Sequence, residues 1–240
     1  MNSEYVSGYP SYHLEGSGSV PAVKLFDLSV YVITDTRLSR GRTNLEVVKE
    51  AMAGGATCIQ LREKELSTRD YFHLAEKLRE LTLEKGVTFI VNDRLDIALA
   101  VGADGVHLGQ DDLPPSVARR IMPPEMILGV TARNVHQAIQ FQEAGATYLG
   151  VGAVYFTGTK SNTGSPIGLQ GLAEICGKVK IPVVGIGGIN TERAGAVIAA
   201  GASGVALVSA VTSATHIAGA VEEIAYAVDQ TRLQQRSSNK

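Results

Sequence analysis

Cysteine is scarce in this chain, and the scarcity excludes two kinds of stabilising site. The 240 residues include 2 cysteines, Cys58 and Cys176. Both lie in apolar stretches, outside any C-x-x-C pair and without a histidine near them in the sequence. A disulfide framework or a zinc site needs more sulfur or imidazole ligands than this. We therefore predict two buried thiols in a reducing compartment, which indicates a cytoplasmic protein.

Long apolar runs, a leader-like N-terminus and an excess of positive charge are also missing. No run reaches the roughly 18 apolar residues that cross a bilayer. The start, MNSEYVSGYPSYHLEGSGSV, has no basic segment followed by an apolar one. The formal net charge is -2, so a broad basic surface for nucleic acid is not expected. These absences predict partners that are small molecules, with no membrane or nucleic-acid partner, and leave the oligomeric state open.

What the chain does contain is a repeated helix ending. Helical patterns end in Gly-Ala before a short strand-like segment at Gly55-Ala56, Gly102-Ala103, Gly145-Ala146 and Gly201-Ala202. Glycine closes a helix there because it adopts the left-handed conformation without steric cost. We predict strands at residues 29–34, 57–62, 88–92, 105–108, 127–131, 148–151, 182–186 and 204–208. Helix N-caps are predicted at Ser67-Thr68, Asn134 and Asn190-Thr191.

Short apolar strands that alternate with amphipathic segments predict an α/β fold, a single-domain (β/α)8 TIM barrel. The alternative is an open doubly wound sheet, which would need a glycine-rich turn where the chain has Thr34-Asp35-Thr36-Arg37. We expect the barrel to occupy residues 27–230. It would lie between a polar N-terminal tail, residues 1–26, and a polar C-terminal tail, residues 231–240.

The second predicted strand raises a question about what its side chains face. Gln60, Arg62 and Lys64 point the same way if the strand alternates with period two. In such barrels the active site lies at the carboxyl ends of the strands. Other predicted strands also end in polar or glycine-rich stretches, namely Asn92-Asp93, Gln110-Asp111-Asp112, Thr131, Thr157-Gly158-Thr159-Lys160, Gly187-Gly188 and Val208-Ser209.

Two carboxylates are expected to converge at this end of the barrel, because Asp93 and Asp112 follow adjacent strands. Such a pair repels unless it is protonated or neutralised by a cation. Oxygen ligands without histidine or cysteine suit Mg²⁺, which keeps waters and takes further ligands from a substrate phosphate. Position alone leaves two alternatives open. Asp93 could be a helix-start carboxylate, and Asp111 competes with Asp112 as the ligand.

Three cations, Arg62, Lys64 and Lys160, are predicted on separate loops of the same rim. A lone surface lysine is usually only solvated. Three cations beside paired carboxylates instead indicate a polyphosphate held jointly by cations and metal. Lys160 lies in residues 156–166, a small, polar, breaker-rich stretch that is typical of a mobile lid.

The glycines after the seventh strand and the turn after the eighth predict a second phosphate site. Ile186-Gly187-Gly188-Ile189 and Val208-Ser209-Ala210 stand where this fold binds a phosphomonoester through backbone N–H groups at a helix start. The alternative is that they are simply tight turns.

In these blocks the sequence resembles the thiamine phosphate synthase family. The resemblance covers residues 28–228 and leaves the N-terminal tail unexplained. Its blocks are Gln60-Leu61-Arg62-Glu63-Lys64, Val91-Asn92-Asp93-Arg94, residues 104–112, Gly129-Val130-Thr131, Thr157-Gly158-Thr159-Lys160 and Gly185-Ile186-Gly187-Gly188-Ile189.

The resemblance implies a TIM-barrel transferase that joins a hydroxymethylpyrimidine diphosphate to a thiazole phosphate and releases pyrophosphate. It implies that Mg²⁺ is bound by Asp93 and Asp112, in preference to Asp111. Thr131 stands where the family usually has serine, and Gly158 where it often has proline, which would loosen the lid. The pyrimidine diphosphate would be held by Gln60, Arg62, Lys64, Asn92 and Lys160, and the thiazole phosphate by Thr157, Thr159, Gly188, Val208 and Ser209. Thr131 is also expected to bind substrate, without assignment to one of the two.

The catalytic roles implied for Arg62, Lys64 and Lys160 are to stabilise charge on the departing pyrophosphate. Three alternatives use the same barrel. A thiazole tautomerase would lack the complete pyrimidine diphosphate set, which is present here. A phosphate-binding sensor would bind without turnover. A phosphosugar isomerase or epimerase would need an acid/base pair, for which His107 and the Asp93/Asp112 pair are candidates, although we interpret His107 as structural.

Overall fold

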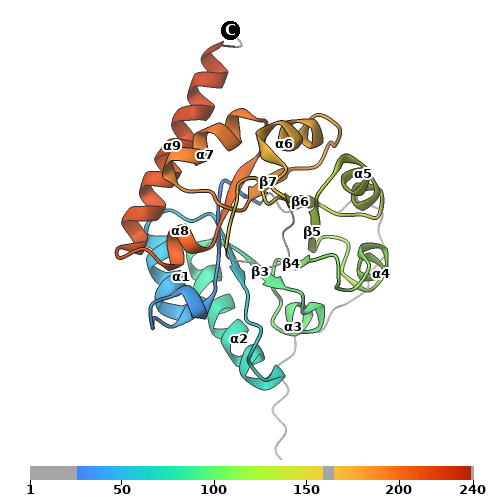
Figure 1. Cartoon of the computed structure of the whole chain (residues 1–240). Coiled ribbons are helices and arrows are strands. Elements are labelled where there is room, and N and C mark those ends of the chain that lie inside the picture. The colour runs from blue at the N-terminus through green and yellow to red at the C-terminus, as the bar shows by residue number, and fades with distance from the viewer. Residues whose placement is uncertain (1–25, 159–164, 239–240) are drawn as a thin grey trace, which may run out of the picture.

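Eight parallel strands close into one barrel in the computed structural model, which describes residues 26–158 and 165–238. Each strand pairs with its neighbours in the sequence, and the eighth pairs with the first. The (β/α)8 TIM barrel is therefore confirmed (Figure 1). The strands are β1 Val30–Ile33, β2 Cys58–Leu61, β3 Thr88–Asn92, β4 Gly105–Leu108, β5 Ile127–Ala132, β6 Tyr148–Val151, β7 Val183–Ile186 and β8 Gly204–Leu207.

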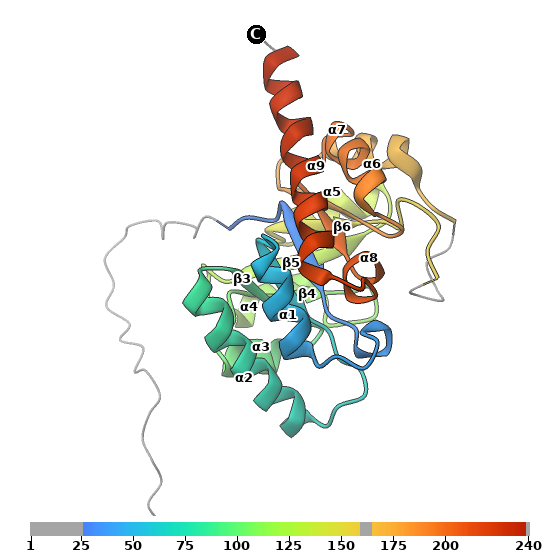
Figure 2. The same cartoon turned by 90° about the vertical axis from the view of Figure 1, so that its left-hand side faces the viewer.

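Helices surround the barrel and connect successive strands (Figures 1 and 2). Within the described ranges, none of them combines the length and the apolar character needed to span a bilayer. They are α1 Asn44–Ala53, α2 Thr68–Lys85, α3 Leu95–Ala100, α4 Pro115–Ile121, α5 Val135–Glu143, α6 Gly168–Cys176, α7 Thr191–Ala199, α8 Ser209–Thr212 and α9 Ile217–Ser238, with a short 3-10 helix at Thr36–Leu38.

The helix boundaries follow the local chemistry of the sequence. The side chains of Ser67, Asn134 and Asn190 each accept a hydrogen bond from a backbone N–H in the first turn of the helix that follows, so all three predicted N-caps are confirmed. The glycines of the repeated Gly-Ala pairs all have positive φ, at 94°, 60°, 91° and 98°. They turn the chain from a helix toward the next strand, which fixes where each strand begins.

Side chains alternate between the two faces of each strand, and the barrel wall therefore separates two apolar cores. Outward-facing residues pack against the helices in the larger core. Inward-facing residues form a smaller core inside the barrel, and this core includes Tyr31 and Tyr148. Both cysteines are free, as expected. Cys58 is buried in the inner core, whereas Cys176 is only half-buried.

The C-terminal end differs from the expected tail, because α9 continues through Ser238. Val221, Ile224 and Val228 bury the first part of this helix against the barrel. Beyond Thr231 the helix is exposed for several residues, and its last turns project away from the barrel (Figures 1 and 2). The polar run that suggested a tail, Arg-Leu-Gln-Gln-Arg, consists of strong helix formers that extend the packed helix. The predicted N-terminal tail lies outside the described residues up to residue 25.

Candidate active site

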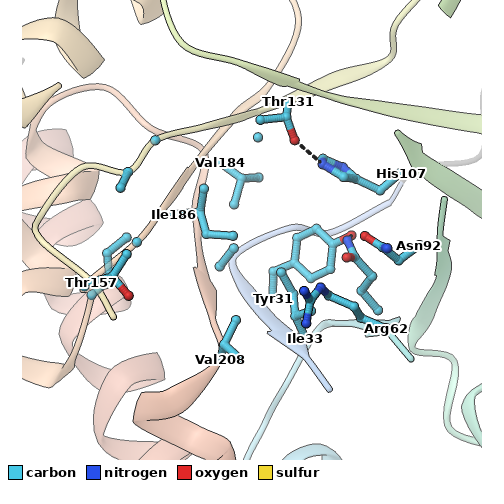
Figure 3. A pocket seen from close by; sticks show the side chains of 18 of the residues that line it. Tyr31, Ile33, Arg62, Asn92, His107, Thr131, Thr157, Val184, Ile186 and Val208 are labelled. Carbon is cyan, nitrogen blue, oxygen red and sulfur yellow. Dashed lines mark hydrogen bonds between the residues drawn. The ribbon is translucent and has the colours of Figure 1, made fainter. Parts of the chain in front are cut away.

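One cavity opens among the carboxyl ends of the strands, and most of the predicted site residues line it (Figure 3). In Figure 3, Arg62 and Asn92 lie on one side of the cavity, and Thr157 and Val208 lie on the other. The predicted residues among those lining it are Gln60, Arg62, Asn92, Thr131, Thr157, Gly188, Val208 and Ser209.

Gln60 and Arg62 face the cavity at the barrel mouth, as their spacing predicts, whereas Lys64 is not among the residues that line it. Gln60 is buried, and its Nε2 donates a hydrogen bond to Tyr31 Oη at 2.6 Å. Arg62 follows two residues later and lines the same cavity. Lys64 lies at the rim, where its Nζ is 3.0 Å from Asp93 Oδ2 while its side chain remains 55% exposed.

Arg62 is held in place by a buried acid that sequence reasoning did not select. Its Nη1 donates to Asp35 Oδ2 at 2.8 Å, and Arg37 Nη2 reaches the same oxygen at 2.8 Å. Burial opposes ionisation of Asp35, but the hydrogen bond and charge of Arg37 and the charge of Arg62 lower its pKa. Arg62 Nε is buried without a hydrogen-bond partner among the described residues. A buried donor of this kind is costly when unpaired, so its position suits an anionic ligand.

Asp93 and Asp112 lie close enough for their carboxyl groups to hydrogen-bond to each other. Asp93 has a φ of 63°, a left-handed conformation that is unusual outside glycine and that aspartate tolerates. Gly109 N donates to Asp112 Oδ2 at 2.6 Å and fixes the second carboxyl group. Burial raises the pKa of Asp112, and the hydrogen bond that its protonated carboxyl group donates to Asp93 adds to that rise. For Asp93, burial acts in the same direction, but the bonds to Asp112 and Lys64 outweigh it and lower its pKa.

This carboxyl pair fits a divalent cation, which would occupy the place of the proton that otherwise relieves the repulsion. Within residues 26–158 and 165–238, no group of three or more His, Cys, Asp or Glu side chains forms a metal cluster. A bound Mg²⁺ would therefore complete its oxygen shell with water or with substrate oxygens, as hard cations commonly do.

The geometry bears on the two alternatives left open by the sequence. Arg94 is the N-cap of α3 and Asp96 is the acid in its first turn, so Asp93 does not cap this helix. Asp111 is exposed, whereas Asp112 is half-buried and adjacent to Asp93. The pair that can share a ligand is thus Asp93 with Asp112.

The opposite side of the cavity is built from backbone. Gly187 and Gly188 follow β7 with φ of 99° and 64°. A Cβ on Gly188 would lie 2.5 Å from the carbonyl oxygen of Phe156, so this loop can approach the β6 loop only with glycine. Arg193 donates to Gly188 O at 2.7 Å and thereby supports the loop from α7. Ser209 is the first residue of α8, at the end of β8.

Thr159 and Lys160 lie outside the described residues, as does most of the predicted lid, so their expected roles stay predictions. Sequence reasoning missed Tyr31, Asp35 and Tyr148. The two tyrosines carried a usable signal, because each occupies an inward-facing position of its strand by the period-two rule. His107, interpreted as structural, also lines the cavity, and its Nε2 is 2.9 Å from Thr131 Oγ1 (Figure 3).

Comparisons with known proteins agree with this geometry. The family model described as thiamine monophosphate synthase matches residues 30–211. A thiamine-phosphate synthase of Moorella thermoacetica is 55% identical over 85% of this chain and 97% of that protein. One from Clostridium novyi is 47% identical over 82% of this chain and 96% of that protein. The solved structure of a thiamine phosphate pyrophosphorylase from Pyrococcus furiosus superposes with a TM-score of 0.80 at 44% identity, covering 85% of this chain and 96% of that one.

The matched segment contains the whole barrel, from β1 to the turn that follows β8. It also contains every residue described above as lining the cavity or pairing at its rim. The chain therefore belongs to the thiamine monophosphate synthase family and is a transferase of thiamine biosynthesis.

Proposed function

We propose that this enzyme condenses 4-amino-2-methyl-5-hydroxymethylpyrimidine diphosphate with a thiazole phosphate in the cytoplasm. The second substrate is hydroxyethylthiazole phosphate or its carboxylated form. The products are thiamine phosphate and pyrophosphate, together with CO2 when the thiazole carries the carboxyl group. The observation that carries the proposal is the adjacent Asp93–Asp112 pair, which lies beside Lys64 at the rim of a cavity whose far side is glycine-rich. That arrangement provides one site for a metal-bound diphosphate and another for a monophosphate.

On the diphosphate side, Arg62 and Lys64 bring positive charge to the anion. Arg62 keeps a buried N–H without a hydrogen-bond partner in the described part of the chain, and Asp35 fixes the plane of its guanidinium group. Lys64 forms a salt bridge with Asp93 on the same side of the cavity. When bound by Asp93 and Asp112, Mg²⁺ supplies further positive charge to the diphosphate oxygens.

The chemical step needs no nucleophile from the protein. The bond between the pyrimidine methylene carbon and the diphosphate oxygen breaks, and its electron pair leaves with pyrophosphate. The electron-rich aminopyrimidine stabilises the resulting carbocation, and the thiazole nitrogen then forms the new carbon–nitrogen bond. Arg62 and Lys64, with Lys160, contribute by holding positive charge where negative charge grows, which is stabilisation of the transition state rather than of the substrate.

On the opposite side, Gly188 and Ser209 offer backbone N–H groups and a hydroxyl to the thiazole phosphate, and Thr157 adds a second hydroxyl. The charge on this phosphate does not change during the reaction. Its site has only to bind and orient the thiazole nitrogen toward the pyrimidine carbon.

Direct product analysis tests the proposal. The purified protein is mixed with both substrates and Mg²⁺, and thiamine phosphate is sought by mass spectrometry, with EDTA and EDTA plus excess Mg²⁺ as controls. We expect product that disappears with EDTA and returns with excess metal. Binding of thiazole phosphate without any product would contradict the proposal and favour the tautomerase or the sensor.

A further inference from the structure

We propose that Tyr31, Tyr148 and His107 form a hydrogen-bonded chain of fixed direction that positions Gln60 and Thr131 to recognise an aminopyrimidine ring. The three are positioning residues, and the inference rests on the proposed function for the identity of the ring. It goes beyond that function because it assigns the orientation of Gln60 and Thr131 to three residues that also line the cavity and that act through them.

The chain is continuous across the interior of the barrel. Gln60 Nε2 donates to Tyr31 Oη at 2.6 Å, and Tyr31 Oη is 2.8 Å from Tyr148 Oη. Tyr148 Oη is 2.8 Å from His107 Nδ1, and His107 Nε2 is 2.9 Å from Thr131 Oγ1. Both ends of the chain, Gln60 and Thr131, line the cavity. Four hydrogen bonds thus connect side chains contributed by β1, β2, β4, β5 and β6.

The hydrogen atoms can run along this chain in one direction. The Gln60 amide nitrogen can only donate, so the Tyr31 hydroxyl accepts a hydrogen bond from it. The Tyr31 hydroxyl in turn donates a hydrogen bond to Tyr148 Oη. Tyr148 then donates to His107 Nδ1, which places the imidazole hydrogen on Nε2, facing Thr131. In the opposite direction the Tyr31 hydrogen would have no acceptor within the chain. Burial raises the pKa of both tyrosines, so each keeps the hydrogen that this arrangement requires.

This direction determines what the cavity offers to a ligand. Thr131 accepts from His107, so its own hydroxyl hydrogen remains to be donated into the cavity. Gln60 uses one N–H on Tyr31 and keeps its carbonyl oxygen and its second N–H. A carbonyl beside an N–H complements an amino group next to a ring nitrogen, as in a 4-aminopyrimidine. The Thr131 hydroxyl serves a further acceptor on the same ligand.

The residues that pack around the hydrogen-bonded chain leave room for two of its rings next to β5 and β6. A Cβ on Gly129 would lie 2.2 Å from Tyr148 Cζ, and a Cβ on Gly150 would lie 2.9 Å from His107 Cε1. Both inward-facing positions must therefore be glycine to admit the two rings. Barrel interiors are usually filled by branched apolar side chains, which need no hydrogen-bond partners. A polar chain that begins and ends in the cavity is better explained by ligand recognition than by packing.

The substitution Tyr148→Phe tests the inference, because it removes the middle oxygen and keeps the ring. The probes are 4-amino-5-hydroxymethyl-2-methylpyrimidine and its analogue without the amino group, bound to the intact protein without metal and measured by calorimetry. We expect the wild type to prefer the amino compound by roughly tenfold or more, the effect of leaving site groups unpaired. In Tyr148→Phe the preference should fall to within about threefold.

A matched control removes a buried hydroxyl elsewhere. Thr82 is fully buried on α2, and its Oγ1 bonds within the helix to Leu78 O at 2.9 Å. Thr82→Val should lose stability without changing the preference between the two pyrimidines. Tyr31→Phe and the double variant Tyr31→Phe/Tyr148→Phe then test whether the chain acts as a unit. If it does, the second substitution adds little to the loss caused by the first.

Two results would overturn the inference while leaving the proposed function intact. One is thiamine phosphate formation by a wild type that does not distinguish the two pyrimidines. The other is a Tyr148→Phe protein that keeps the wild-type preference. Independently of any variant, ¹⁵N NMR of the intact protein should show His107 with its hydrogen on Nε2, and a hydrogen on Nδ1 would contradict the direction. Because binding is read separately from turnover, failure to form thiamine phosphate would count against the function alone.

Discussion

The two sides of the cavity mouth differ in the groups that they present: charged side chains on one side and backbone on the other. The side formed by β2, β3 and β4 carries charged side chains that are already paired with one another, as in Arg62 with Asp35 and Lys64 with Asp93. The side formed by β7 and β8 carries glycines with positive φ and the start of a short helix. One side holds charge on side chains, and the other holds partial charge on backbone N–H groups.

The difference corresponds to what each proposed phosphate does. The diphosphate gains negative charge as it leaves, so groups that strengthen their interaction during the step accelerate it. The thiazole phosphate keeps its charge, and a rigid backbone site binds it equally well before and during the step. Substitutions on the first side should therefore lower kcat, and substitutions on the second should raise KM for thiazole phosphate.

The largest effect is expected from Asp93→Asn. Asparagine also tolerates the left-handed backbone at this position, so the fold should persist. By analogy with oxyanion-hole donors, kcat should fall about 100- to 1,000-fold, on the order of 2.7–4 kcal/mol. Losing the exposed contact with Lys64 should change the free energy of unfolding by less than about 1 kcal/mol.

Steady-state kinetics with saturating Mg²⁺ and denaturant unfolding together measure this prediction. Asp96→Asn is the matched control, because Asp96 is a neighbouring acid whose exposed side chain bonds to Arg94. Near-normal kcat in Asp93→Asn would remove Asp93 from the metal site.

Gly188→Ala should have the next largest effect and should act on the other side of the comparison. Alanine at a φ of 64° is strained, and its Cβ would collide with the backbone of the β6 loop. Strain of roughly 1–3 kcal/mol should raise KM for thiazole phosphate by about tenfold or more, with a smaller change in KM for the pyrimidine diphosphate. Gly219→Ala in α9, where a Cβ meets nothing within 4 Å, is the control. A fall in kcat with both KM values unchanged would contradict the division of roles.

Asp35→Asn should have a moderate effect, because it acts through Arg62. Losing one charge-assisted hydrogen bond costs roughly 1.5–3 kcal/mol, and some of that cost should appear as about a tenfold loss in kcat/KM for the pyrimidine diphosphate. Arg37→Ala removes the exposed partner of the same carboxylate and should change kcat/KM much less. Equal losses in the two variants would show that Asp35 does not act by orienting Arg62.

The smallest effect is expected from Asp111→Asn, measured beside Asp112→Asn. Asp111 is exposed, so its substitution should leave kcat within about twofold of the wild type, as surface substitutions usually do. Asp112→Asn should resemble Asp93→Asn in kcat and in its response to Mg²⁺. A larger loss in Asp111→Asn than in Asp112→Asn would reverse the assignment made from the geometry.

Much of the barrel could be predicted because local chemistry and the global fold agree. The Gly-Ala pairs place a left-handed glycine before a strand in each case, and the predicted strands lie within about one residue of those observed. Gln60 and Arg62 were predicted to share a face because alternation along a strand is fixed by backbone geometry. The C-terminal tail was predicted incorrectly because a polar run was interpreted as frayed, although its residues favour the helix that precedes it.

The rest of the site depends on contacts between strands that no local pattern reports. Tyr31 and Tyr148 are far apart in the sequence and meet only when β1 and β6 close around the barrel interior. The role of Asp35 also depends on the position of Arg62 across the neighbouring strand. Period-two alternation can place the two tyrosines on the inner face of the barrel, but only a partner on another strand shows what each of the three side chains does.

The most direct test of the two-sided account is a pair of calorimetric titrations with and without Mg²⁺. Pyrophosphate and thiazole phosphate are each titrated into the intact protein, with correction for the complex that Mg²⁺ forms with pyrophosphate in solution. The account predicts that pyrophosphate binding requires Mg²⁺ and is lost in Asp93→Asn, while thiazole phosphate binds equally well with and without the metal. Pyrophosphate binding that is unchanged by Mg²⁺, or thiazole phosphate binding that depends on it, would contradict the account.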